Sequence, residues 1–200
     1  EISTRDWSSD VCSSDLIEID GSSRERVDEE CQRIGELFLE ASALDVYVGN
    51  TPATERKMWR PRISLAEAFK VLNPIQSIED IVVPTARIPD LVRELERLAA
   101  AYDVLIPCYG HAGDGNLHAT PLKKPETAKE VWKENLPRLL SELYGIVFRL
   151  GGTISGEHGI GSKRAPYMPI VMGPELIALH KRIKQAFDPL NILNPGKIFL

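Results

Sequence analysis

The sequence predicts an α+β fold: an antiparallel or mixed sheet, helices on one face of that sheet, and a helical tail at the C-terminus. Segments with strand-like and helix-like apolar spacing alternate along the chain, which indicates a layered domain. Asp114-Gly115 lies between two apolar runs, and this dipeptide is typical of an antiparallel hairpin. After Gly151-Gly152 the chain is rich in glycine, proline and turns around one last helix.

The individual elements follow from apolar spacing and from the residues that begin or end them. Gly21-Ser22-Ser23 and Thr51-Pro52 are start signals for the first two helices, and Asn73-Pro74 and Gly151-Gly152 are stop signals. The expected strands are 16–20, 45–49, 78–83, 104–111 and 117–121, and the expected helices are about 21–38, 52–72, 88–99, 127–150 and 174–188. Hairpin pairing with helices between the strands resembles a ferredoxin-like sandwich.

Residues 1–16 do not read as the start of a domain. They repeat Ser-Ser-Asp, show no apolar periodicity, and lack the basic and apolar regions of a targeting signal. One reading frame of a sequencing-library adapter translates into most of this segment, so we interpret residues 1–16 as an adapter translation and not as native protein. We therefore expect the native sequence to begin near Ile17, already inside a fold, and the domain to comprise residues 17–200.

Composition limits the partners of the chain. The formal net charge is −5, and residues 1–16 supply most of it, because they hold four acidic side chains and one basic one. The remainder is near neutral, so we expect no electrostatic preference for nucleic acid or for anionic membranes. No apolar run is long enough for a transmembrane segment, and the two cysteines beyond residue 16 form no disulfide pattern. These features predict a cytoplasmic location.

The predicted hairpin carries the first chemical motif, which runs from Gly110 to His118. A two-residue turn at Asp114-Gly115 would place His111 directly opposite His118 on one face. Two facing imidazoles can bind one divalent cation, whereas the alternative is an ordinary cross-strand pair on a half-buried face. Cys108 lies an odd number of residues from His111, so we expect it on the opposite face of the strand.

A glycine-rich segment, 151–163, carries the second motif. Five glycines in so short a run disfavour a regular helix or strand, so we expect this backbone to lie close against another group. Glu157 would complete a metal site with His111 and His118, and His158 would point elsewhere and could move a proton. The alternative is a flexible surface loop in which both side chains are solvated.

Three motifs together resemble a known family. They are 110–118, 151–161 and the closing stretch from Phe187 to Lys197. In this order they resemble the C-terminal cap domain of the FAD-linked oxidases, in particular the group of the glycolate oxidase FAD subunit, D-lactate dehydrogenase and D-2-hydroxyglutarate dehydrogenase. The resemblance covers residues 17–200 and implies that a separate N-terminal FAD-binding domain, missing from this chain, carries most of the flavin.

The resemblance implies an activity as well as a fold. Similar enzymes oxidise a 2-hydroxy acid to a 2-oxo acid, with metal assistance and hydride transfer to FAD, and pass electrons to an acceptor protein or subunit. A complex of that kind would lie at the periphery of the inner membrane. Thr120 stands where some 2-hydroxyglutarate enzymes have asparagine, so we expect a small monocarboxylate substrate such as glycolate or D-lactate.

The resemblance also implies residue roles. Three positions match ligands of a divalent metal, zinc or manganese, and three match a catalytic base, a residue against the flavin, and an arginine that pairs with the substrate carboxylate. The metal ligands are His111, His118 and Glu157, the base is His158, the cofactor-binding residue is Asn194, and the substrate-binding residue is Arg62. A solvated helix arginine is the alternative for Arg62.

Two other functions are open from the sequence. One is a non-catalytic, metal-binding cap module that docks on a separate flavin subunit. The other is a metal-dependent hydrolase that uses the same ligands and a bound water. If the FAD-binding domain is missing, we expect this chain alone to be inactive as an oxidase.

Overall fold

The computed structural model describes residues 15–199 and divides the chain into two compact units, Glu1–Ala68 and Phe69–Leu200. Fourteen of the sixteen residues that we interpret as an adapter translation lie outside the described part. That interpretation therefore stays a prediction.

The first unit is built from α1 (Arg24–Glu40) and from α2 (Pro52–Leu72), whose last residues belong to the second unit. Ser23 begins α1 as predicted, and its side chain accepts a hydrogen bond from the backbone N–H of Arg26. The strands expected at 16–20 and 45–49 are wrong, because both segments are irregular backbone in the structure. A strand forms only where another strand accepts its hydrogen bonds, and short apolar runs carry no information about that partner.

The second unit contains a three-stranded antiparallel sheet in the order β1-β3-β2. The strands are β1 (Glu79–Val82), β2 (Cys108–His111) and β3 (Asn116–Ala119). Helix α3 (Ile88–Tyr102) connects β1 to β2, and α4 (Lys129–Arg149) follows β3. After α4, Thr153 exchanges two backbone hydrogen bonds of 2.9 and 3.0 Å with Val82 at the outer edge of β1. This β-α-β-β-α order with a final edge pairing confirms the α+β prediction and matches the ferredoxin-like motif.

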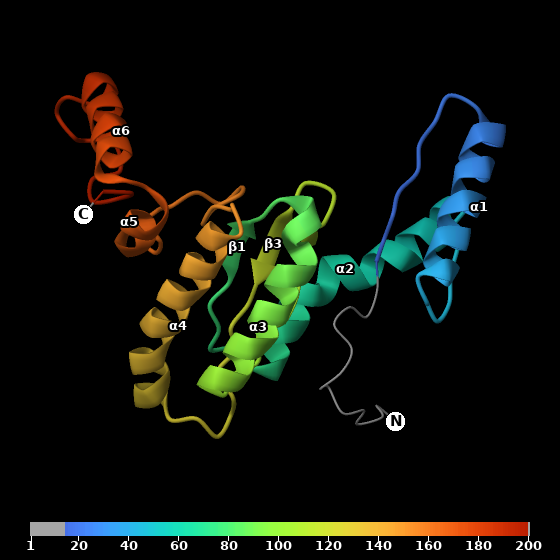
Figure 1. The fold of residues 1–200 in the computed structure, drawn as a ribbon, viewed down its shortest axis with the longest axis horizontal. Helices are drawn as coiled ribbons and strands as arrows, with labels where there is room; N and C mark the ends of the chain where they lie inside the picture. The colour runs from blue at the N-terminus through green and yellow to red at the C-terminus, as the bar shows by residue number, and fades with distance from the viewer. Residues whose placement is uncertain (1–14, 200) are drawn as a thin grey trace. The chain divides into compact units, whose positions relative to one another are not determined.

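Helices α3 and α4 cover one face of the sheet and form the core with it (Figure 1). Each helix turns an apolar stripe inward, with leucines three and four residues apart on α3. The buried core side chains are Ile81, Leu117 and Ala119 from the sheet, Leu91, Leu95 and Leu98 from α3, and Leu139, Leu140, Leu143, Tyr144, Ile146 and Val147 from α4. Cys108 packs against this core, as the alternation along its strand predicted. The opposite face of the sheet is left for polar side chains.

The C-terminal tail consists of short helices and turns. The 3-10 turn η2 (Ala165–Tyr167) precedes α5 (Met168–Val171) and α6 (Pro174–Phe187), whereas the other 3-10 turn, η1 (Thr85–Arg87), lies between β1 and α3. The backbone N–H of Ile198 donates a 2.7 Å hydrogen bond to the carbonyl of Gly161. The closing stretch therefore returns to the glycine-rich segment.

Among residues 15–199, no helix combines the length and the apolar character needed to cross a membrane.

Candidate functional site

The hairpin between β2 and β3 has a register different from the predicted one. Tyr109 lies opposite His118, and His111 lies opposite Asn116, so the direct pairing of the two histidines is wrong. A shift by two residues preserves the face on which a side chain lies, because side chains alternate with a period of two. Both imidazoles therefore still lie on one side of the sheet, diagonally, with ring centres 6.4 Å apart.

The turn has more residues than expected, and two contacts stabilise this longer loop. The loop has four residues, 112–115, and the Asp114 carboxylate accepts a 3.0 Å hydrogen bond from the backbone N–H of Asn116. Gly115 has φ of +78° and accepts a 3.1 Å backbone hydrogen bond from Val83 at the end of β1. A Cβ at Gly115 would lie 2.0 Å from the Val83 carbonyl oxygen, so only glycine fits there. The contact with β1 is long-range, and an Asp-Gly signal alone does not predict it.

Asp80 of β1 holds the glycine-rich segment against the polar face of the sheet. Its Oδ2 accepts hydrogen bonds of 2.8 to 3.0 Å from the Ser155 hydroxyl and from the backbone N–H groups of Gly156, Glu157 and His158. Its Oδ1 accepts a 2.7 Å hydrogen bond from Nδ2 of Asn116 on β3. The segment is thus fixed through its backbone, and its side chains are presented to His118.

These hydrogen bonds decide the charge of the buried Asp80 carboxylate. Burial by itself raises its pKa, but the hydrogen bonds from the His158 backbone, the Asn116 side chain, the Glu157 backbone and the Ser155 hydroxyl together outweigh burial. The pKa of Asp80 is therefore held well below its usual range, and the group is an anion at neutral pH.

Gly156 meets the predicted need for close backbone approach. A Cβ there would lie 2.2 Å from Nδ2 of Asn116 and 2.7 Å from a methyl group of Val82. Any larger residue would push the segment away from Asp80 and from β1.

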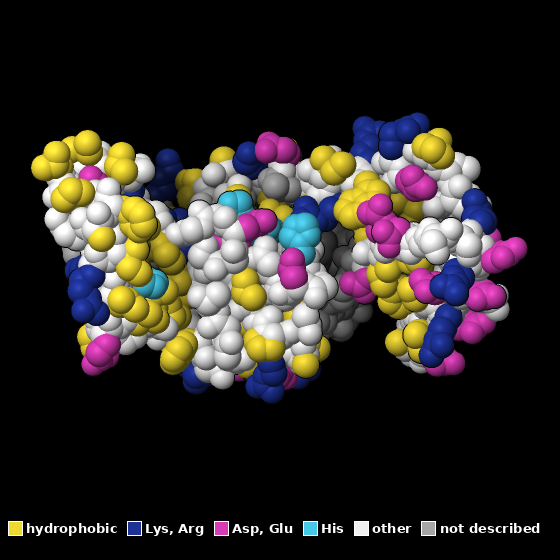
Figure 2. Space-filling view, turned by 90° about the horizontal axis from the view of Figure 1, so that it is seen from above, with side chains coloured by type: hydrophobic (Ala, Val, Ile, Leu, Met, Phe, Trp, Pro, Cys, Tyr) yellow, Lys and Arg dark blue, Asp and Glu magenta, His cyan; other side chains and the backbone are white. Residues whose placement is uncertain are grey.

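Four side chains from three segments converge on this face. Potential ligand atoms of Asp80, His118, Glu157 and His158 all lie within 4.8 Å of one another. Oε1 of Glu157 lies 3.2 Å from Nε2 of His118 and 3.4 Å from Nε2 of His158. Asp80 and His118 are buried, whereas Glu157 and His158 are about half exposed (51% and 57%). Figure 2 shows histidine and acidic side chains next to one another on one face of the molecule.

The donor set fits a divalent transition-metal cation. Zinc bonded to two imidazole nitrogens at about 2.0–2.1 Å and near-tetrahedral angles places the ring centres about 5 Å apart. The ring centres of His118 and His158 are 5.4 Å apart, which agrees, and those of His111 and His118 at 6.4 Å are wider. His111 is exposed at the end of β2, so a side-chain rotation can change that distance.

The structure brings some of the predicted residues together and not others. His118, Glu157 and His158 are in the group of four, and His111 is beside the group but outside it. Arg62 lies in α2 within the first unit, so its role as a carboxylate partner stays a prediction. Asn194 is exposed in a turn of the tail, with φ of +49°, and its role against the flavin also stays a prediction.

Asp80 is the residue that sequence reasoning missed. It appeared only as part of an expected strand, although two consecutive carboxylates, Glu79 and Asp80, directly before the apolar run 81–83 are themselves a signal. Burial of an acidic side chain requires compensating donors, and these come from residues 36 to 78 positions away.

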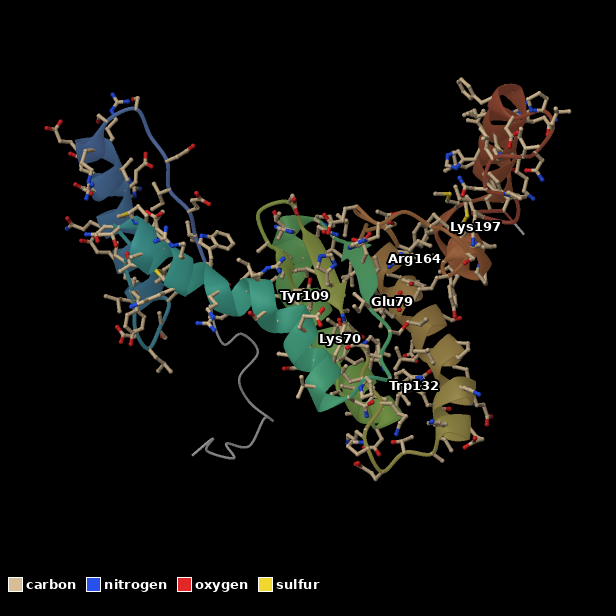
Figure 3. The ribbon with its side chains drawn as sticks, turned by 180° about the vertical axis from the view of Figure 1, so that it is seen from behind. Lys70, Glu79, Tyr109, Trp132, Arg164 and Lys197 are labelled. Carbon is tan, nitrogen blue, oxygen red and sulfur yellow. The ribbon has the colours of Figure 1, made fainter. Side chains whose placement is uncertain are left out.

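A second buried carboxylate lies on the core face of the same strand. Oε2 of Glu79 accepts a 2.5 Å hydrogen bond from the Tyr144 hydroxyl, and its Oε1 accepts one of 2.6 Å from Ser77. Nζ of Lys163 lies 2.8 Å from Oε1, and Nε of Arg164 lies 3.8 Å from Oε2. Glu79 and Arg164 are labelled in Figure 3. Glu79 thus holds the far end of the glycine-rich segment.

Comparison with known proteins finds one family and several relatives. The family "FAD linked oxidases, C-terminal domain" matches residues 4–198. D-lactate dehydrogenase of Anaerostipes hadrus is 36% identical over 183 residues, and glycolate oxidase subunit GlcD of Bacillus subtilis is 38% identical over 184 residues. D-2-hydroxyglutarate dehydrogenase of Stutzerimonas stutzeri is 27% identical over 186 residues. Each alignment covers 92% of this chain, which spans only 38 to 40% of the length of these relatives.

Proposed function

Because the chain belongs to the FAD-linked oxidase C-terminal domain family, we propose that it is the substrate-binding part of an FAD-dependent 2-hydroxy-acid dehydrogenase or oxidase. The substrate would be a small monocarboxylate, glycolate or D-lactate, which becomes a 2-oxo acid. An N-terminal FAD-binding domain and an electron acceptor would complete the enzyme. Two of the relatives are named for these substrates, a D-lactate dehydrogenase and a glycolate oxidase subunit, and this supports the substrate class.

The convergence of His118, Glu157 and His158 carries the proposal. These residues come from the central strand β3 and from the segment after α4, yet their side-chain donors meet on the polar face of the sheet. Two imidazoles and a carboxylate are a donor set that binds divalent transition metals and leaves positions open for a substrate. Glu157 and His158 are half exposed, so the group is accessible from solvent on their side.

We assign one task to each residue. His118 and Glu157 would bind the cation, with His111 as the third ligand after rotation of its exposed side chain. His158 would accept the proton of the substrate hydroxyl, because an imidazole nitrogen can act as a general base and its half-exposed ring is accessible to a substrate. A bound divalent cation would make the coordinated substrate hydroxyl more acidic, and bound FAD would accept the hydride from the substrate. In a second arrangement, favoured by the 5.4 Å distance between its ring and that of His118, His158 replaces His111 as ligand.

A chimeric enzyme tests the activity. Residues 17–200 replace the corresponding region of Bacillus subtilis GlcD, and flavin bleaching is followed without oxygen after addition of glycolate, D-lactate or D-2-hydroxyglutarate. We expect bleaching with the first two substrates, and at least a hundredfold slower bleaching in the His158→Ala variant. His180→Ala, on α6, is the matched control and should leave the rate unchanged.

Two results would count against the proposal. A folded, flavin-loaded chimera that is bleached by none of the three acids would remove the activity. Bleaching of His158→Ala at the wild-type rate would remove the base assignment alone. Zinc affinity then separates the two ligand sets, because His111→Ala weakens binding in the first set and His158→Ala weakens it in the second.

A further inference from the structure

The Asp80 carboxylate has an unusual set of partners for a group so close to a candidate metal site. It is completely buried, and the described residues supply five hydrogen bonds to its two oxygens. Three of the five come from consecutive backbone N–H groups, those of Gly156, Glu157 and His158. Successive N–H groups that point at one oxygen form an anion-binding concavity, and here the anion is part of the protein.

The same three residues include both half-exposed members of the site. Glu157 and His158 have no regular secondary structure to orient them, and the segment has glycine on both sides of the pair, at 156 and 159. The directions in which the two side chains leave the chain therefore depend on the contacts that fix the backbone of this segment. Asp80 supplies those contacts from β1, whose pairing with β3 also places His118 directly opposite Asp80.

We propose that Asp80 is a positioning residue that holds Glu157 and His158 in register with His118 through the backbone of residues 156–158. This inference deepens the proposed function, because the side chains it orients are the proposed ligand and base. Asp80 can do this without binding the metal, because its Oδ2 already accepts four hydrogen bonds and its Oδ1 accepts one from Asn116. A carboxylate that binds a metal needs lone pairs directed at the ion, and those of Oδ2 are used by the segment.

Asn116 is the second part of this device. Its Nδ2 donates to Oδ1 of Asp80 and, at 3.3 Å, to the Ile81 carbonyl, and it also fills the space beside Gly156. Asn116 therefore holds Oδ1 of Asp80 away from the glycine-rich segment, and Oδ2 is left to accept hydrogen bonds from the backbone N–H groups of that segment.

Amide hydrogen exchange of the full 200-residue chain, in EDTA and without added metal, tests this inference. In Asp80→Asn we expect exchange at residues 156–158 to be at least tenfold faster than in wild type, with unchanged protection of α3 and α4. Asp28→Asn, which removes the same charge from an exposed ion pair with Arg24 on α1, should change neither region. Zinc affinity, measured by titration with the metal alone, should fall 10- to 100-fold in Asp80→Asn.

If Asp80→Asn fails to fold, two less disruptive variants at Ser155 test the same inference. Ser155→Ala removes only the hydroxyl that donates to Oδ2, and we expect a severalfold faster exchange at 156–158. Ser155→Thr keeps a hydroxyl and should restore the wild-type rate. A general loss of stability would not show this rescue.

The outcomes separate this inference from the proposed function. Unchanged exchange at 156–158 in Asp80→Asn, or in Ser155→Ala if Asp80→Asn fails to fold, would overturn the positioning role. So would amides that are already unprotected in wild type. A change seen only with zinc present would make Asp80 a ligand and also overturn it. If exchange responds as expected while wild type binds no zinc, the positioning role stands and the proposed metal function fails.

Discussion

Glu79 and Asp80 are consecutive residues of β1, and their carboxylates are buried on opposite faces of the sheet. Both hold the glycine-rich segment, but they do so at different ends and by different partners. Asp80 binds backbone N–H groups of residues 156–158, whereas Glu79 binds the side chains of Lys163, Arg164 and Tyr144.

The difference shows how one strand can both stabilise the glycine-rich segment and orient the side chains of the site. Backbone donors fix the path of the chain directly, so the Asp80 end determines where Glu157 and His158 point. Long side chains can reach a carboxylate from many backbone positions, so the Glu79 end anchors the segment without defining its path as closely. We therefore expect changes at Glu79 to affect mainly stability and changes around Asp80 to affect mainly the site.

The largest effect should come from Glu79→Gln. This change removes the counter-charge of Lys163 and of the buried Arg164, and breaking a buried ion pair costs about 3–5 kcal/mol. Urea unfolding of the full chain at pH 7 measures it. Glu94→Gln, which removes an exposed partner of Arg97, is the control and should leave the midpoint near wild type. A loss below about 1 kcal/mol in Glu79→Gln would show that this end is not an anchor.

Added zinc should stabilise the second unit by a somewhat smaller amount. At a zinc concentration of about 100 times the dissociation constant, binding to the folded state adds about 2.7 kcal/mol, and EDTA removes it. Thermal unfolding with and without zinc measures this difference. It should vanish in His118→Ala and persist in His180→Ala. An equal shift in all three proteins would mean that zinc binds elsewhere.

Gly156→Ala tests the Asp80 end by steric means. The added methyl group would meet Asn116 and Val82 at 2.2 and 2.7 Å, so the segment must move, at about 1–3 kcal/mol. We expect zinc affinity to fall together with stability, because the movement separates the backbone from Asp80. Gly113→Ala in the hairpin loop is the matched control, since nothing lies within 4 Å of its added Cβ. Unchanged zinc affinity in a destabilised Gly156→Ala would show that the two ends do not differ as we describe.

The smallest effect concerns a carboxylate at the surface, Glu142 on α4. A hydrogen bond from Arg97 lowers its pKa, partial burial opposes this, and a bond from Tyr102 adds to the lowering. Because the folded pKa lies below the unfolded one, the stability it contributes is complete above the unfolded pKa of about 4.3. That stability is lost as the pH falls through the folded value.

Glu142→Gln should therefore lose about 0.5 kcal/mol at pH 7, and its stability should approach that of wild type as the pH falls through the folded pKa of Glu142. Urea unfolding at several pH values measures the difference, with Glu134→Gln on the same helix as control. A difference that grows as the pH falls would contradict the lowered pKa.

Much of the second unit was predictable because its signals are local. Apolar spacing and end signals placed β1, α3, α4 and α6 close to their observed bounds, and Gly151, with φ of +82°, follows the C-cap of α4 as expected. The segments 16–20 and 45–49 failed because a strand depends on a partner elsewhere in the chain. The hairpin register failed for the same reason, since β1 holds Gly115 and widens the turn.

The sequence by itself determined the fold class, the family and the segments that carry His118, Glu157 and His158, because each depends on residues that are neighbours in the chain. Only the tertiary structure decided that His111 lies outside the group of four and that Asp80 belongs to it. The groups that donate hydrogen bonds to Asp80 lie 36 to 78 residues away along the chain. A buried carboxylate needs such donors, and only the folded sheet brings them to it.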